Sequence, residues 1–299
     1  MKNEANNNRV NVYQQVTDRI IAQMEKGIVP WQKPWTGAAD GSINYVSRRA
    51  YSVLNQWLLG RDGEWLTFKQ VQQCGGRIKK GAKAGMVVFY TQQQYKVMVN
   101  VEDEDGNVHE EERTKVKPVL RAYNVFHISD CEGIESKIQE AVENEVEPIE
   151  QAEKVISEYV SREKELTFRN DSVTDKAYYS PSSDMVCVPM ISQYDVVEEY
   201  YSTTFHELVH STMKETRCNR KAENKMAAFG SADYSREELV AETGSAMLCT
   251  KVGIDCDKAF KNSVAYIQSW LKALKNDNKM IVWAASRAEK AAKYIMGEQ

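Results

Sequence analysis

Histidine and paired cysteines are scarce in this chain. Its 299 residues include four histidines and six cysteines. The cysteines are scattered, and no two of them form a C-x-x-C motif. We therefore expect free, mostly buried thiols in a reducing compartment, and we find no zinc-finger pattern that would read duplex DNA.

Long apolar runs are absent as well. No stretch approaches the roughly 18 apolar residues that a bilayer-crossing helix needs. The N-terminal sequence "MKNEANNNRV" lacks the apolar core of a signal peptide. These absences predict a cytoplasmic protein without a membrane partner. With 42% hydrophobic and 27% charged residues, the composition is that of a globular protein, and the length is sufficient for two domains.

Charge is distributed unevenly along the chain. Residues 1–100 carry 14 Lys and Arg against 6 Asp and Glu, a net charge of +8. The remainder carries 25 against 37, a net charge of −12, and the two parts sum to −4. This asymmetry favours a polyanionic partner for the first part, although a merely solvated basic face would give the same count.

Periodicity and turn residues predict an α+β protein of two domains. Residues 1–130 form an α+β domain, with helices over 11–26, 50–59 and 67–75 and strands over 85–90, 94–101 and 117–128. Residues 131–150 are acidic and lack an apolar stripe, so we predict a linker there. Residues 151–299 form a mainly helical domain with a small sheet, including a helix near 149–161, two short strands within 177–189 and a long helix over 194–216.

Two of the four histidines lie in the stretch "FHELVHSTMK", four residues apart. On a helix, an apolar stripe faces one side, and His206 and His210 lie on the opposite side with Glu207 beside them. Two imidazoles one turn apart can bind one Zn²⁺ ion, and the intervening glutamate can reach its water. The alternative is a surface helix with two exposed histidines. The residues of the predicted core stripe are Tyr201, Thr204, Phe205, Leu208 and Thr212.

A catalytic zinc site needs a third protein ligand, and "YSREELVAETGSAMLC" supplies two candidates one helical turn apart. If Ser235 and Glu238 form a capping box, Glu238 is a helix cap and Glu242 is the ligand. If the helix begins earlier, with Asp233 as a possible cap, Glu238 binds zinc and Glu242 accepts a hydrogen bond from a ligand histidine. We favour the second arrangement because thermolysin-type sites have a ligand glutamate followed four residues later by a supporting carboxylate.

The chemistry of such a site is hydrolysis of a protein or peptide. Zinc lowers the pKa of its bound water to about 7, and Glu207 takes the proton and passes it to the leaving amine. Tyr234, close to the start of the second helix, is a candidate for stabilising the oxyanion, although a tyrosine there also fits a packing role.

Four of the six tryptophans lie within 35 residues of the basic first part, interleaved with cations. Aromatic rings beside positive charges are what single-stranded DNA requires, because every base can stack and every phosphate is charged. Trp57 lies on an amphipathic helix and is expected in the core instead. The predicted DNA-binding residues are Trp31, Trp35, Arg48, Arg49, Lys69, Arg77, Lys79, Lys80 and Lys83.

Taken together, these motifs resemble the ArdC type of plasmid antirestriction protein over nearly the whole length. The resemblance rests on "VTDRIIAQMEKGIVPWQKPW", "EWLTFKQVQQCGGRIKKGAKAGMVVFY" and "AYNVFHISDCEGI", then on "YYSPSSDMVCVP", "FHELVHSTMKETRCNR" and "YSREELVAETGSAML". It implies an N-terminal single-stranded-DNA-binding domain and a C-terminal zincin-like metallopeptidase domain, encoded by a mobile element. It also implies zinc on His206, His210 and Glu238, with Glu207 as the base.

The sequence departs from that family pattern at two places. "NYVSRRAYS" lacks the glycine-containing turn expected there, which leaves the role of Arg48 and Arg49 open, and the acidic insert at 102–112 is long. Three functions remain compatible with the sequence: a DNA-tethered zinc peptidase, a non-catalytic single-strand coat or restriction decoy with structural zinc, and a protease of DNA–protein crosslinks. An intact Glu207 favours an enzyme, because a structural zinc site has no use for a base.

Overall fold

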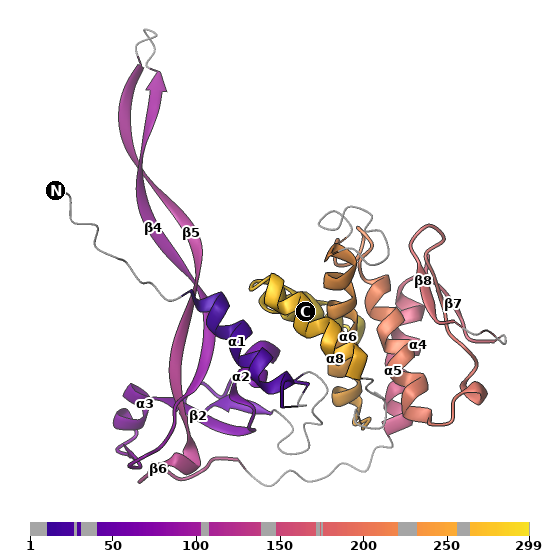
Figure 1. The fold of residues 1–299 in the computed structure, drawn as a ribbon, viewed down its shortest axis with the longest axis horizontal. Helices are drawn as coiled ribbons and strands as arrows, with labels where there is room; N and C mark the ends of the chain where they lie inside the picture. Colours follow the sequence, from indigo (N-terminus) through magenta and orange to yellow (C-terminus); the bar gives the residue numbers. More distant parts are fainter. Residues whose placement is uncertain are drawn as a thin grey trace.

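A computed structural model describes residues 11–26, 29–30, 41–102, 108–138, 148–171, 174, 176–220, 232–255 and 264–298. The fold is α+β, with a sheet-rich N-terminal part and a mostly helical C-terminal part that contains a small sheet (Figure 1). The predicted fold class is therefore confirmed.

The N-terminal part is built on a four-stranded sheet in the order β1-β2-β5-β4, in which only the β1–β2 pair is parallel. A second ladder joins β3 to β6. The elements are α1 (Val12–Met24), β1 (Ser42–Asn44), α2 (Val53–Leu59), β2 (Gly63–Thr67), α3 (Phe68–Gln73), β3 (Arg77–Ile78), β4 (Gly85–Glu102), β5 (Val108–His127), η1 (Ile128–Asp130) and β6 (Cys131–Glu132).

Two of the three predicted helices of this part, α1 and α3, begin at residues whose side chains cap them. Asn11 accepts a hydrogen bond from the Tyr13 backbone N–H at the start of α1. Thr67 and Gln70 form a capping box at the start of α3. Trp57 on α2 is buried, as its amphipathic position predicted. These helices thus follow from local sequence patterns.

One long hairpin takes the place of the separate short strands that the sequence predicted. β4 and β5 pair without interruption from Gly85 opposite Val125 to Glu102 opposite Val108. The inner end of the hairpin belongs to the four-stranded sheet, and the outer part projects beyond it as a twisted two-stranded arm (Figure 1). The prediction divided β4 because glutamines interrupt its apolar residues, but a strand outside a core does not need continuous apolar residues.

The turn after β1 forms without a glycine, contrary to what the family pattern led us to expect. Arg48 adopts a left-handed backbone conformation, with φ at 58°. Its guanidinium pairs with Glu64, whose side chain is fully buried. Ser136 and the Lys137 backbone N–H also donate to the Glu64 carboxylate. Arg48 therefore holds an internal ion pair, which compensates for the strain at its φ angle.

The first residues of the predicted linker pack against the N-terminal part. Cys131 and Glu132 pair with β3, and the Tyr45 hydroxyl donates to the carbonyl of Glu135. These contacts extend the N-terminal part at least to residue 137, past the boundary expected at 130. Residues 139–147 lie outside the described residues.

The C-terminal part is a helical layer with a three-stranded sheet in the order β7-β9-β8 at one side (Figure 1). The sequence predicted α4, α5 and the β8–β9 pair but not α8, α9 or β7. The elements are α4 (Pro148–Arg162), β7 (Thr167–Arg169), β8 (Tyr178–Ser180), β9 (Met185–Cys187), η2 (Ile191–Gln193), α5 (Val197–Ser211), α6 (Ala232–Val252), α8 (Val264–Asn276) and α9 (Met280–Met296).

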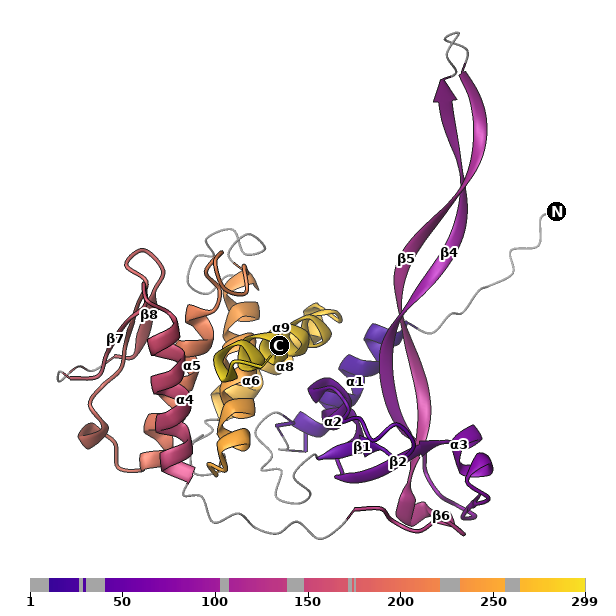
Figure 2. The same ribbon diagram turned by 180° about the vertical axis from the view of Figure 1, so that it is seen from behind.

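The two parts share one hydrophobic core, because α1 and α2 pack against α8 and α9 (Figure 2). Thr17 on α1 donates a hydrogen bond to the Asn278 carbonyl at 2.9 Å, and Lys275 pairs with Glu25 at 2.9 Å. Cys74, Cys131, Cys187 and Cys218 are free thiols. No described helix is both long and apolar enough to cross a bilayer.

Arg217 anchors the end of α5 and is held by Asp184 in the β8–β9 turn. Arg217 is almost fully buried and donates to both oxygens of Asp184 at 2.8 Å. Burial would raise the pKa of Asp184, but hydrogen bonds from Arg217, Lys214 and Tyr179 outweigh it and lower the pKa to about 2. The ionised carboxylate is therefore part of the folded structure.

We expect Asp184→Asn to lower the free energy of unfolding by about 3 kcal/mol, because it removes the carboxylate that both Arg217 and Lys214 contact. The buried Arg217 is then left with Glu163 as its remaining counter-charge. The folded pKa of Asp184 lies below its unfolded value of about 3.9. The wild type thus has the full contribution of this carboxylate above about pH 4 and loses it as the pH falls toward 2, whereas the variant lacks this loss. Urea titrations at several pH values measure both effects. Asp171→Asn is the matched control, because Asp171 is exposed; an equal loss in both variants contradicts the assignment.

Candidate metal centre

Helix α5 presents the two histidines as its periodicity predicted. The residues predicted to form its core stripe are all buried, and His206 and His210 lie on another side with side chains 19% and 13% exposed. That side is covered by α6, so the histidines do not lie on an open surface. The alternative of an exposed surface helix is therefore excluded.

Three side chains converge between α5 and α6. The Nε2 atoms of His206 and His210 are 3.1 Å apart. Glu238 on α6 places one carboxylate oxygen 3.6 Å from the Nε2 atom of His206 and the other 3.5 Å from that of His210. A tetrahedral ion with ligand bonds of about 2.0–2.1 Å requires donor atoms about 3.3 Å apart. The spacing of these donors therefore fits a tetrahedral metal ion.

Close contact between α5 and α6 makes this convergence possible. A Cβ atom on Gly244 would lie 2.8 Å from the Cγ2 atom of Val209, which is closer than real Cβ atoms approach. Only glycine lets the two helices approach this closely beside His210. Ser245 on α6 also donates a hydrogen bond to the Ser202 carbonyl of α5 at 2.7 Å. Gly244 could not be found from the sequence, because a helical glycine has no local signature of close packing.

The choice between the two candidate glutamates is decided by where α6 begins. The helix already includes Ala232, so Ser235 and Glu238 lie inside it and not at its start. Glu238 is consequently a residue of the second turn and not a helix cap. Among the described residues, His206, His210 and Glu238 form the group that could hold a metal ion.

Glu237 is a supporting carboxylate on the Nδ1 side of the His210 ring. Its Oε1 atom is 3.5 Å from the Nδ1 atom of His210. Arg220, which is 2% exposed, donates to Glu237 at 2.6 Å and to the Val209 carbonyl at 2.9 Å. The arginine thereby ties the end of α5 to α6. Sequence reasoning found neither residue, since a buried ion pair between distant positions has no periodic signal.

His210 and the two glutamates beside it shift each other's pKa values toward their charged forms. Burial would lower the pKa of His210, but Glu237 and Glu238 outweigh it and raise the pKa to about 10. Burial would raise the pKa of Glu238, but His206 and His210 hold it well below its usual range. The negative charge needed to neutralise a divalent cation is therefore present at the site.

Glu242 lies one turn beyond Glu238 and is enclosed. Its Oε2 atom is buried and has no hydrogen-bond partner among the described residues. Burial raises its pKa, and the charges of His206 and His210 oppose this shift. The predicted hydrogen bond from a ligand histidine is not among the contacts of Glu242, and its supporting role stays a prediction.

Glu207 lies beside the histidines, with a residue exposure of 8%. Its carboxylate makes no hydrogen bond within the part of the chain that the structure describes. Tyr194 lies near it: burial raises the pKa of this tyrosine, and the Glu207 carboxylate adds to the effect. The backbone of Tyr234 belongs to α6, but its side chain lies outside the described residues, so its predicted role stays a prediction.

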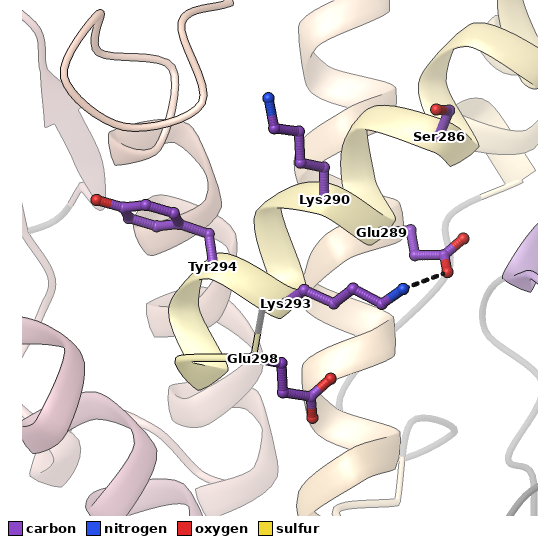
Figure 3. A pocket seen from close by; sticks show the side chains of 6 residues that line it. All are labelled: Ser286, Glu289, Lys290, Lys293, Tyr294 and Glu298. Atoms are coloured by element: carbon purple, nitrogen blue, oxygen red, sulfur yellow. Dashed lines mark hydrogen bonds and ion pairs between the residues drawn. The ribbon is translucent and has the colours of Figure 1, made fainter.

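A hollow of about 400 Å³ lies elsewhere, along α9 (Figure 3). Among its lining residues, Lys293 and Glu289 form an ion pair along α9 at 3.1 Å. None of its lining residues belongs to the metal-ligand group. The hollow therefore has no part in the chemistry at α5 and α6.

The predicted DNA-binding cations divide into two groups. Besides Arg48, Arg77 pairs with Glu132 and Lys79 donates to the Ser129 carbonyl, so these three are engaged within the protein. Trp31 and Trp35 lie outside the described residues. The cations that are exposed and have no carboxylate partner within the described residues are Arg49, Lys69, Lys80 and Lys83.

Both parts of the chain match known families. Residues 10–126 match the N-terminal domain of the anti-restriction factor ArdC, and residues 153–287 match the zincin-like metallopeptidases. Over 97% of its length the chain resembles the crystal structure of the antirestriction ArdC protein from plasmid R388, covering 99% of that chain with 30% identity and a TM-score of 0.67. The chain belongs to the ArdC family of antirestriction proteins. The predicted resemblance is thereby confirmed, and the zincin-like domain carries the three metal-ligand residues.

Other relatives extend the comparison. The Mn(II)-bound structure of the R388 ArdC protein has a TM-score of 0.69, with 30% identity over 96% of this chain and 97% of that one. An uncharacterized protein, y4eC of Sinorhizobium fredii, is 30% identical over 96% of this chain and 92% of its own length. A DNA primase TraC of Escherichia coli is 30% identical over 95% of this chain. The chain spans only 27% of that primase.

Proposed function

We propose that this ArdC-family chain binds single-stranded DNA through its N-terminal part and hydrolyses peptide bonds at a zinc ion held by His206, His210 and Glu238. The observation that carries the proposal is the convergence of these three donors at tetrahedral spacing, beside a carboxylate that has no structural partner in the described residues. Three protein ligands leave one position of a tetrahedral ion for water or substrate, which is the arrangement of a catalytic site.

The donor set suits zinc, because imidazole nitrogens and a carboxylate oxygen are its usual ligands. The R388 relative was crystallised with Mn(II), so the identity of the metal is part of the proposal. A zinc ion bound here would polarise a substrate carbonyl and lower the pKa of a water. Glu237 would hold the His210 ring in the orientation that points its Nε2 atom at the ion.

Glu207 performs the proton transfers in this proposal. Its carboxylate accepts a proton from the attacking water and passes it to the amine nitrogen that leaves. Its place beside the ligand histidines supports this role, because its side chain has no hydrogen-bond partner within the described residues and is available to a water at the ion. Glu242 lies one turn behind Glu238, and we retain it as the supporting carboxylate on the other side of the ligand group.

Nucleic-acid binding is assigned to the N-terminal part because this part matches the ArdC N-terminal domain and carries the excess of cations. The protein substrate is unidentified. A coat or decoy with structural zinc is the second candidate, but it gives no reason for Glu207 to lie unbonded among the described residues beside the ligands. A protease of DNA–protein crosslinks would use the same two parts and differs only in its substrate.

The function is tested by incubating the zinc-loaded full chain with a pool of DNA-binding proteins, with and without single-stranded DNA. New protein N-termini are then labelled and identified by mass spectrometry. We expect cleavage to rise on the order of 10²-fold with DNA, because a shared strand raises the local concentration of enzyme and substrate. Substrates that are cut only when covalently attached to DNA would indicate the crosslink protease. No new N-termini under any condition would contradict the enzyme and favour the coat.

A further inference from the structure

The register of the long hairpin sorts its side chains onto two faces. Directly opposed residues of an antiparallel pair share a face, and so do residues two apart along a strand. Phe89 opposite Arg121, Gln93 opposite Lys117 and Tyr95 opposite Lys115 therefore lie on one face. We call this set the hairpin stripe. It consists of Phe89, Thr91, Gln93, Tyr95, Val97, Arg113, Lys115, Lys117, Val119, Arg121 and Tyr123.

The stripe carries charge of one sign. It contains four cations and no acidic residue, although the next outward pair on the same face, Val99 and Glu111, is acidic; on the opposite face Lys96 pairs with Glu112 at 2.6 Å. Arg113 is also paired, with Glu111 at 3.0 Å. The other three cations of the stripe are exposed and have no carboxylate partner within the described residues; they are Lys115, Lys117 and Arg121.

Aromatic rings alternate with these cations. Phe89, Tyr95 and Tyr123 are 45%, 38% and 39% exposed, which is high for large rings in a sheet. The rings of Phe89 and Tyr123 lie 6.0 Å apart, and Lys117 lies 5.2 Å from the centre of the Tyr95 ring. Each exposed ring thus has a cation of the stripe near it. If a base stacked on the ring, this cation could bind the neighbouring phosphate.

The fold itself does not require this pattern. Toward the base of the hairpin the same face is covered, since Val87 is buried against Tyr51 and Trp65. Farther out the arm projects beyond the four-stranded sheet, and no helix of the described residues lies against its outer part (Figure 2). The ring of Phe89 lies 6.2 Å from that of Tyr51, yet all three rings keep 38–45% of their surface exposed, so packing accounts for only part of the pattern.

We propose that the hairpin stripe is a binding surface for single-stranded nucleic acid, on which bases stack against Phe89, Tyr95 and Tyr123 while Lys115, Lys117 and Arg121 bind phosphates. This inference rests on the proposed DNA binding and gives it a location that the sequence analysis did not consider. From Phe89 to Tyr95 the strand spans about 20 Å, at about 3.4 Å per residue, which accommodates several nucleotides. The surface reads no base edges, so binding depends little on sequence.

The test measures binding of the full chain to a fluorescent oligothymidylate by anisotropy over a range of salt concentrations. Tyr95→Ala should weaken binding about 5- to 150-fold with the salt slope unchanged, because a stacked base is lost. Replacing Lys115, Lys117 and Arg121 together by Ala should flatten the slope by about two, at about 0.7 per phosphate for single strands.

Matched controls lie on the opposite face and in the basic loop. Met98→Ala removes a 58% exposed side chain from the other face, and Lys96→Ala removes a cation from it, so neither should change binding. Replacing Lys79, Lys80 and Lys83 together by Ala gives the same loss of charge as the stripe triple variant, at the place that the sequence favoured. The side chains replaced in these controls are exposed, and among them Lys79 donates to the Ser129 carbonyl, so melting temperatures are used to confirm folding.

The outcomes separate the two claims. If wild type binds the oligonucleotide and only the stripe variants weaken it, the inference holds. If wild type binds but the loop variant flattens the slope and the stripe variants do not, the stripe is overturned and the proposed DNA binding stands. If wild type fails to bind, both claims fail. If Tyr95→Ala abolishes self-association of the chain and leaves DNA affinity unchanged, the stripe is a protein contact and the inference is likewise overturned.

Discussion

His206→Ala and His210→Ala should each abolish stoichiometric zinc binding, whereas the wild type should carry about one zinc per chain. Each substitution removes one of three donors that converge between α5 and α6, and two remaining protein ligands do not form a stable site. Metal content is measured by plasma mass spectrometry after dialysis against zinc buffered by a chelator. Full occupancy in the His206→Ala, His210→Ala double variant would show that the metal lies elsewhere.

The same assay ranks the carboxylates. Glu238→Ala should weaken zinc more than Glu237→Ala or Glu242→Ala, whose effects should be about 10–100-fold, because those two carboxylates act on the ligands and not on the ion. His109→Ala is the matched control, since it removes a histidine from the outer part of β5. A larger effect for Glu242→Ala than for Glu238→Ala would reverse the assignment of the third ligand.

Glu207→Gln should retain zinc and lose peptidase activity by about 10²- to 10⁴-fold. The amide keeps the size of the side chain but cannot accept the proton of the attacking water, and a general base contributes a factor of this order. The rate is measured with the zinc-loaded variant on casein and on the pool of DNA-binding proteins. Glu215→Gln is the matched control. It makes the same change of charge at an exposed position shortly after the two histidines in the sequence, and it should have no effect.

The opposite result would be equally informative. If Glu207→Gln cleaved at the wild-type rate, the observed activity would belong to a contaminant or to another site. If it lost its zinc together with its activity, Glu207 would be a ligand, and its place beside the metal site would need a different explanation. Loss of activity at full zinc occupancy is the outcome that only a proton-transfer role produces.

The elements that the sequence predicted are those with a local, periodic signal. The core stripe of α5 repeats at helical spacing, so the face carrying His206 and His210 followed from it. The start of α6 could not be predicted from the sequence alone. Ser235 and Glu238 fit the pattern of a capping box, but the helix already includes Ala232. Arg48 shows the same limit: its left-handed conformation depends on the buried Glu64, which lies on a different strand.

Most of what the sequence missed depends on contacts between distant residues. Glu237 and Arg220 are 17 positions apart and find each other only because Gly244 lets α6 pack closely on α5. The hairpin stripe was missed for a related reason. Its pattern becomes visible only when the register places Arg121 opposite Phe89 and Lys115 opposite Tyr95, because two of the three rings lie on β4 whereas the cations lie on β5.

Anomalous diffraction from crystals of the Glu207→Gln variant grown with zinc tests the central claim most directly. Data collected above and below the zinc absorption edge locate the ion and identify it at once. We expect one strong peak within about 2.0–2.2 Å of the Nε2 atoms of His206 and His210 and of a Glu238 carboxylate oxygen, with a further position open to solvent. A zinc peak bound to any other set of side chains, or a site closed by a fourth protein ligand, would contradict a catalytic metal centre here.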